Sequence, residues 1–166
     1  MDAHKQRMRQ SSVECDWRTP PQLVEKLRMR WAFDIDLAAT NESSVVEVKI
    51  NGERCAVYLG PDNNTPYQDA LQVAWHQVAK VGFLNPPYSL TQYREGLEAG
   101  KSRTELAWLL IENWVRKAYE ESQLGFTTVA VLPYAPQTGW FREYVMGHRQ
   151  QPVPDPVDPQ ACTYRV

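Results

Sequence analysis

The first regular hydrophobic pattern along the chain spans residues 19–31. Val24 and Leu27 recur there at helical intervals. Thr19 stands directly before two prolines, and this order favours a helix start with Thr19 as the capping residue and proline in the first turn. Residues 33–39 (FDIDLAA) then predict a short strand that runs into a loop.

A second apolar pattern surrounds the dipeptide Asn51-Gly52. Residues 45–50 before it and 56–59 after it are rich in strand-forming side chains, so we predict a β-hairpin with a two-residue turn or a slightly longer loop. Residues 61–66 are dense in Asn, Asp and Pro and predict a loop. Residues 70–78 fit no single period, and their structure stays open.

The second half of the chain alternates between strand and helix patterns. Residues 81–84 are a short apolar run that ends at the tetrapeptide 85–88, which contains two consecutive prolines. Because proline donates no hydrogen bond to a strand ladder, the strand is predicted to end there. Ser89 with Gln92 resembles a capping box for a short helix that Gly100 would close.

A longer helix is predicted over residues 102–123, after a second capping box in which Ser102 pairs with Glu105. Its apolar face would consist of Leu106, Leu110, Trp114 and Ala118. Residues 127–132 (TTVAVL) predict a β-branched strand. Thr138 would cap a last helix that carries Phe141, Tyr144 and Val145.

This order of strand, helix, strand and helix implies a parallel α/β sheet with right-handed crossovers. A chain of 166 residues corresponds to one domain. Residues 1–16 are polar, and we expect a mobile arm there. Residues 17–148 would form the folded domain, and residues 149–166, which carry four prolines within eight residues, would form an extended tail.

Composition excludes several classes of protein. A hydrophobic content of 43% argues against a disordered chain. The longest dense apolar stretch, 106–111, is far shorter than the ~20 residues that span a bilayer, and no apolar block follows the basic N-terminus as in a secretory signal. The three Cys and three His lack disulfide-framework or metal-ligand spacing. We therefore expect a cytoplasmic protein with no membrane or metal partner.

The charge distribution adds little about partners. The net charge of −2 gives no support by itself to nucleic-acid binding. Residues 2–30 carry seven Lys and Arg against four Asp and Glu, and such a segment can meet phosphates even on a neutral protein. Taken alone, the charges favour a solvated N-terminal segment.

The tetrapeptide Asn85-Pro86-Pro87-Tyr88 carries the most specific chemistry. The exocyclic amine of a nucleobase is a weak nucleophile, because its lone pair is conjugated into the ring. The Asn85 side-chain oxygen and the Pro86 carbonyl are two acceptors that would hold its hydrogens, and Pro87 restricts the backbone of Pro86 in advance. Tyr88 offers a flat face for a base that has left its stack. In open parallel sheets, ligands bind outside the carboxyl ends of strands, which is where this tetrapeptide would lie.

The chain resembles the short phage and prophage DNA N-6-adenine methyltransferases (Dam-like), and NPPY resembles motif IV of amino-methyltransferases that use S-adenosylmethionine. The family's ordered motifs have counterparts over residues 17–141. A W-x-T-P start stands at Trp17 to Pro20, a D-x-x-A segment with a following Asn at Asp36 to Asn41, and a D-x-L before a Trp at Asp69 to Trp75. NPPYS follows at Asn85 to Ser89, a W-x-x-K-A helix at Trp114 to Ala118, and an apolar L-P strand end with T-x-W-F at Leu132 to Phe141.

This resemblance implies a Rossmann-like class I methyltransferase sheet and an enzyme that methylates the N6 of adenine in double-stranded DNA, with the base flipped into a cleft. Asn85, Pro86, Pro87 and Tyr88 would hold the base. Asp36 and the backbone around Ala38 would border the methionine and ribose part of S-adenosylmethionine, and Asp69 would accept from its adenine amine. Cofactor-binding positions would be Trp17, Thr19, Pro20, Asp36, Ala38, Asn41 and Asp69, with Thr19 and Pro20 near the cofactor carboxylate.

The chain departs from the family pattern in two ways. Ala38-Ala39 stands where most methyltransferases of this fold have a glycine-rich loop. The sheet is expected to be abbreviated, and the proline-rich tail implies either a C-terminal truncation or a sheet that closes differently. Two alternatives therefore stay open: a methyltransferase of glutamine side-chain amides in proteins, which present the same lone-pair problem, and a non-catalytic nucleic-acid-binding remnant of the family.

Overall fold

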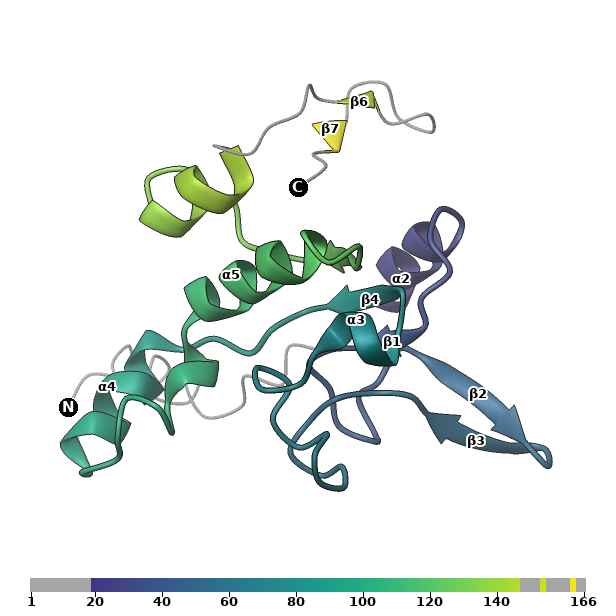
Figure 1. Ribbon diagram of the computed structural model, residues 1–166, viewed down its shortest axis with the longest axis horizontal. Helices are drawn as coiled ribbons and strands as arrows, with labels where there is room; N and C mark the ends of the chain where they lie inside the picture. The colour runs from purple at the N-terminus through teal and green to yellow at the C-terminus, as the bar shows by residue number, and fades with distance from the viewer. Residues whose placement is uncertain (1–18, 147–152, 155–161, 164–166) are drawn as a thin grey trace, which may run out of the picture.

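The computed structural model describes residues 19–146 and two short strands at 153–154 and 162–163 (Figure 1). The predicted arm over 1–16 lies outside the described residues, as does Trp17. Of the predicted tail, the structure describes β6 (Val153–Pro154) and β7 (Cys162–Thr163), which pair antiparallel.

A parallel three-stranded sheet organises the fold. Its strands are β1 (Ile35–Asp36), β4 (Val81–Leu84) and β5 (Thr127–Ala130), in the order β1-β4-β5. Phe83 lies opposite Asp36 on one side and opposite Val129 on the other. Because all three strands are parallel, their carboxyl ends meet at one edge of the sheet. The predicted parallel α/β arrangement is confirmed for these three strands.

Strand β1 is shorter than the predicted strand over 33–39, because its backbone leaves β4 after Leu37. The backbone N–H of Leu37 still donates to the Phe83 carbonyl at 2.8 Å, but the N–H of Ala39 donates to the Leu59 carbonyl at 3.1 Å. Asp36 also forms an isolated parallel bridge with Tyr58. The segment that follows β1 is therefore held between the sheet and the chain around Leu59.

The predicted hairpin is confirmed. Strands β2 (Glu47–Ile50) and β3 (Glu53–Ala56) pair antiparallel, and both residues of the turn have positive φ, 54° at Asn51 and 86° at Gly52. Two positive φ values are what a type I′ turn requires, which explains the Asn-Gly sequence. The ribbon projects from the rest of the fold (Figure 1), and its second strand begins three residues earlier than predicted.

Helix α2 (Pro21–Arg28) begins where the sequence predicts, but its predicted cap is wrong. Pro20 occupies the capping position, and no side chain caps the helix. Pro20 and Pro21 have no N–H to be capped, and the Leu23 N–H donates to the Pro20 carbonyl at 2.9 Å. At the other end, the Arg28 guanidinium donates to the Val45 carbonyl and ties the helix to the loop after β1.

Helix α4 (Leu90–Glu98) follows the prediction closely. The Ser89 hydroxyl accepts from the Gln92 N–H at 3.2 Å, and Gly100 has a φ of +82° just beyond the helix. The short helix α3 (Trp75–Val78) lies within the segment whose structure the sequence left open.

The single helix predicted over 102–123 is wrong, because the chain breaks at Leu110 into two helices. A 3-10 helix, η1 (Ala107–Leu109), precedes α5 (Ile111–Ser122), and Leu110 between them is extended. The indole Nε1 of Trp114 donates to the Trp108 carbonyl at 2.8 Å, so that carbonyl is not met by the next helical turn. The predicted Ser102–Glu105 capping box does form, with hydrogen bonds in both directions, but it closes only a local turn.

The predicted last helix is present over residues 139–146, and its final part, η2 (Phe141–Met146), has π-helical geometry. Thr138 is not its side-chain cap, because its hydroxyl donates to the Ala135 carbonyl at 2.7 Å. Trp140 and Phe141 are buried against Val115 of α5, so a second small core joins this helix to α5.

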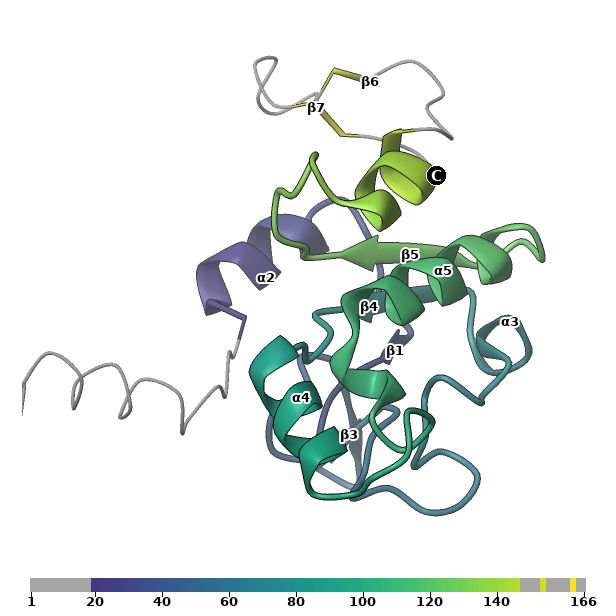
Figure 2. The same cartoon turned by 90° about the vertical axis from the view of Figure 1, so that its left-hand side faces the viewer.

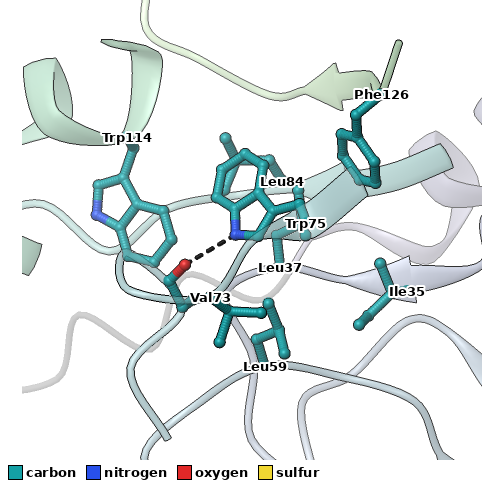
Figure 3. Packing of buried hydrophobic residues seen from close by; sticks show 9 residues of the cluster. Ile35, Leu37, Leu59, Val73, Trp75, Leu84, Trp114 and Phe126 are labelled. Atoms are coloured by element: carbon teal, nitrogen blue, oxygen red, sulfur yellow. Dashed lines mark hydrogen bonds between the residues drawn. The ribbon is translucent and has the colours of Figure 1, made fainter. Parts of the chain in front are cut away.

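The main core lies between the sheet, α5 and the chain around Leu59 (Figure 3). Its largest fully buried side chain is Trp75, whose indole Nε1 donates to the Ala70 carbonyl at 2.8 Å. Gly82 of β4 is needed here, since a Cβ would lie 2.7 Å from side-chain atoms of both Leu37 and Phe126. Figures 1 and 2 both show α5 alongside β4 and β5.

A buried carboxylate fastens α5 to α3. Glu121 accepts from the His76 backbone N–H at 2.9 Å, contacts the His76 ring nitrogen at 2.6 Å and pairs with Lys117 at 2.7 Å. Burial by itself would raise the pKa of Glu121, but these partners outweigh it and hold the pKa at about 2. The body of the fold is thus anchored away from the edge where the three strands end.

Candidate active site

A cavity of about 500 Å³ lies where the three parallel strands end; we call it the strand-end cavity. Its walls come from Asp36 of β1, from residues 85–89 after β4, and from residues 131–133 after β5. Thr19 and Pro20, at the start of α2, also line this cavity. The rule that ligands bind outside the carboxyl ends of parallel strands is met by residues from every strand of the sheet.

A second cavity of about 590 Å³ adjoins the first; we call it the loop cavity. Its walls come mainly from the loops at 59–61 and 68–72 and from the region of η1. The two cavities share five lining residues, which are Ala38, Ala39, Ser43, Pro87 and Trp108. The pair therefore forms one cleft with two compartments, each in the size range of small-molecule sites.

The tetrapeptide 85–88 faces the strand-end cavity, as its position after β4 predicts. Asn85 is partly buried and Pro86 is buried, whereas the Tyr88 side chain is 48% exposed. The Asn85 Nδ2 donates to the Thr19 Oγ1 at 3.0 Å. An amide and a rigid double-proline backbone thus lie inside the cavity, and an aromatic ring remains available at its mouth.

Asp36 is the most unusual ionisable group of the site. Only 3% of it is exposed, and burial raises its pKa from 3.8 to about 6. Hydrogen bonds from the backbone N–H groups of Val45, at 2.9 Å, and Ala38, at 3.4 Å, oppose this shift in part. A buried carboxylate of this kind would be stabilised in its charged form by a cation placed in the cavity.

Asp69 lines the loop cavity, in a region of the chain that is otherwise turns. Its Oδ1 accepts from the Leu71 N–H at 3.1 Å, and its own carbonyl accepts from the Gln72 N–H at 3.0 Å. The side chain is exposed, and the local turn holds it at the cavity wall. The structure therefore brings Asp69 into the same cleft as Asp36 and Asn85, in the neighbouring compartment.

The remaining sequence-predicted residues divide into three groups. Pro20 lines the strand-end cavity, and Ala38 and Pro87 line both cavities. Asn41 lines neither cavity; its backbone N–H donates to Asp62 and its carbonyl accepts from Arg54. Trp17 lies outside the described residues.

Trp108 is a site residue that the sequence analysis missed. It is 44% exposed and lines both cavities, and its carbonyl is fixed by the Trp114 indole. One sequence signal was available: Trp108 is a large aromatic residue that falls outside the predicted apolar face of its helix. An aromatic ring left off a core face is a candidate for ligand contact.

The two adjoining compartments give the cleft room for two molecules side by side. Among the described residues, no three His, Cys, Asp or Glu side chains gather as a metal ion would require. In that same part of the chain, no helix is long and apolar enough to cross a membrane. The cleft walls carry hydrogen-bond acceptors, a buried carboxylate and exposed aromatic rings.

A family model described as DNA N-6-adenine-methyltransferase (Dam) matches residues 6–149 of the chain. No curated protein and no solved structure matches. The matched span includes every described residue of both cavities.

Proposed function

The chain belongs to the DNA N-6-adenine-methyltransferase (Dam) family, and from this premise we propose that it transfers a methyl group from S-adenosylmethionine to the exocyclic N6 of adenine in double-stranded DNA. The family implies adenine methylation in DNA. The methyl donor, the flipping of the target base and the roles of individual residues are our proposal. The parallel order β1-β4-β5, with the cleft at its carboxyl edge, supports an abbreviated Rossmann-like class I methyltransferase sheet.

One observation carries the proposal: Asn85 and Pro86, the two acceptors that an adenine amine needs, line a cavity at the end of β4. The Asn85 Oδ1 and the Pro86 carbonyl accept the two N6 hydrogens. This aligns the nitrogen lone pair away from the ring and makes it a better nucleophile. Acceptors that are fixed before the base arrives stabilise the transition state without a cost of reorganisation.

Tyr88 receives the base after it leaves the duplex. Its half-exposed ring at the mouth of the strand-end cavity is suited to stack on a purine that comes from outside. Asn85 and Pro86 lie deeper in the same cavity, so a base stacked on Tyr88 presents its amino edge inward. The methylated amine then releases one proton, and because a protonated aryl amine is strongly acidic, the site needs no strong base.

The cleft fits S-adenosylmethionine in the chemistry of its walls. When bound, this molecule supplies a methyl group on a positively charged sulfur. Asp36 would hold the positive part, because a neighbouring cation offsets the cost of its buried charge. Asp69, in the adjoining loop cavity, would accept a hydrogen bond from the adenine amine, and Pro20 would border the carboxylate end.

Methyl transfer can be measured directly. We would incubate the full chain with DNA and S-adenosylmethionine that carries a tritiated methyl group, digest the DNA, and separate the nucleosides. The expected product is N6-methyldeoxyadenosine, and the matched Asn85→Ala protein should form almost none. A folded chain that leaves adenine unmodified would refute the proposed activity.

Parallel reactions with protein substrates test the first alternative, methylation of glutamine side-chain amides. Calorimetric titration with S-adenosylmethionine tests the second, because a non-catalytic remnant would bind none.

A further inference from the structure

The hydroxyl of Thr19 lies in an unexpected place. The residue order predicts it as the cap of α2, and the family resemblance implies a place near the cofactor carboxylate. Instead, Pro20 occupies the capping position and no side chain caps the helix. The Thr19 Oγ1 instead accepts from the Asn85 Nδ2 at 3.0 Å, across 66 positions of sequence. Both residues line the strand-end cavity.

This contact matters because the two ends of a side-chain amide have opposite chemistry. The oxygen of Asn85 accepts hydrogen bonds and the nitrogen donates them, although the two ends are almost equal in size. An adenine amine needs the oxygen. Rotation of the amide by half a turn would present N–H groups to the N–H groups of the base, and the acceptor would be lost.

The start of α2 is a firm support for the hydroxyl. Thr19 is followed by Pro20 and Pro21, whose rings restrict the backbone. The Pro20 carbonyl accepts from the N–H groups of Leu23 at 2.9 Å and Val24 at 3.2 Å, and Val24 is buried. Thr19 is therefore attached directly to a helix that is packed in place.

We propose that Thr19 is a positioning residue for Asn85: it engages the amide nitrogen and so keeps the amide oxygen directed at the target amine. The expected effect of Thr19 on turnover rests on the proposed function. The inference assigns Thr19 to the base rather than to the cofactor carboxylate. Thr19 does not touch the reacting atoms, and its effect passes entirely through Asn85.

The kinetic test uses Thr19→Val, which keeps the shape but removes the hydroxyl, and Thr19→Ser, which keeps the hydroxyl. Thr19→Val should lower kcat by about 10- to 100-fold, the scale expected when a reacting group loses its orientation. The affinity for S-adenosylmethionine should stay within about twofold, and Thr19→Ser should restore most of the turnover. Thr91→Val, on the exposed face of α4, is the matched control that should change neither quantity.

A second measurement needs no turnover. In ¹⁵N–¹H spectra, the side-chain amide pair of Asn85 is identified by its absence from the Asn85→Ala protein. Thr19→Val should shift this pair, while Thr19→Ser and Thr91→Val should leave it in place. If the wild-type chain transferred no methyl group, the proposed function would fail, and these spectra would still decide whether Thr19 holds the amide.

Two results would overturn the inference. One is a Thr19→Val protein that binds S-adenosylmethionine much more weakly but keeps its kcat at saturating concentration, since this is the behaviour of a cofactor contact. The other is an Asn85 amide pair that does not respond to Thr19→Val. A variant Asn85→Asp adds a further check, because a carboxylate has an acceptor at both ends and should depend less on Thr19.

Discussion

The strand-end cavity and the loop cavity adjoin each other, but they are built in different ways. In the strand-end cavity, the chemical groups follow strands directly: Asp36 ends β1 and Asn85 follows β4. In the loop cavity, Asp69 is held by a turn of its own backbone. Groups on strands are placed more accurately than groups on loops. On the proposed function, we expect the strand-end cavity to hold the reacting groups and the loop cavity to contribute binding.

The strongest test of this division is Asn85→Ala. The substitution removes an acceptor that acts on the target amine, so turnover should fall by about 10²- to 10³-fold, the loss seen when one preorganised hydrogen-bonding group is deleted. The affinity for S-adenosylmethionine should hardly change, because the amide serves the transition state. Single-turnover kinetics and calorimetry separate the two effects. A parallel fall in cofactor affinity would contradict the division between the cavities.

The buried carboxylate of the strand-end cavity should make stability depend on pH. Asp36 has a pKa of about 6 in the folded chain and an ordinary value of 3.8. Between these pH values the folded state binds more protons than the unfolded state, so rising pH favours unfolding. The free energy of unfolding should fall by about 2 kcal/mol between pH 4 and pH 6 from this group. The total fall should be about 3 kcal/mol between pH 3 and pH 7, and the contribution should stay level above pH 7.

Chemical denaturation at several pH values, with Asp36→Asn as the comparison, measures this contribution. The variant should lose the decrease between pH 4 and pH 6, whereas Asp69→Asn in the loop cavity should keep it. Bound S-adenosylmethionine should make the decrease smaller and end it at a lower pH, because a nearby cation favours the charged carboxylate in the folded chain. A wild-type profile that matches that of Asp36→Asn would show that burial at this position does not perturb the carboxyl group.

Local sequence signals predicted the strand-end cavity better than the loop cavity. An apolar run followed by two prolines locates β4 and the residues after it, and Asn51-Gly52 locates the hairpin. These signals act within a few residues of the structure that they specify. Asp69, in contrast, was assigned only by family resemblance, because a carboxylate in a turn has no spacing that points to a ligand.

The errors in the sequence analysis come from contacts between distant or competing groups. Apolar spacing from Leu106 to Ala118 fits one helix. In the structure, the Trp114 indole donates to the Trp108 carbonyl, and two helices, η1 and α5, are present in place of one. The same break turns Trp108 toward both cavities. Thr19 stands where a helix cap is expected, yet its hydroxyl accepts a hydrogen bond from the Asn85 side chain. Helical periodicity and capping propensity contain no information about such partners.

Tyr88 tests the mouth of the strand-end cavity. Loss of one stacked ring costs about 1–3 kcal/mol, so Tyr88→Ala should raise the KM for DNA by about 5- to 150-fold. Tyr88→Phe retains the ring face and should stay within about threefold of the wild-type value. Steady-state kinetics over a range of DNA concentrations distinguish the two variants. Equal defects in the Phe and Ala proteins would mean that the tyrosine hydroxyl, and not its ring, meets the base.

The smallest expected effect belongs to the loop cavity. Asp69→Asn keeps an oxygen for the turn but removes the charge that would strengthen a bond to the cofactor's adenine amine. For an exposed group, a bond of this kind is worth about 0.5–1.5 kcal/mol, so the affinity for S-adenosylmethionine should fall by about 2- to 10-fold. Turnover at saturating cofactor should not change. Asp62→Asn, a carboxylate in the neighbouring loop that lines neither cavity, is the matched control.

An analogue of the cofactor whose purine lacks the 6-amino group makes the Asp69 prediction specific. The wild-type chain should bind it more weakly than S-adenosylmethionine, and Asp69→Asn should reduce this preference, because the bond that distinguishes the two molecules has lost its charged acceptor. Calorimetric titration gives both affinities for both proteins. An equal preference for S-adenosylmethionine over the analogue in the wild-type chain and in Asp69→Asn would show that Asp69 does not bind the 6-amino group. A residue other than Asp69 would then have to recognise the adenine of the cofactor.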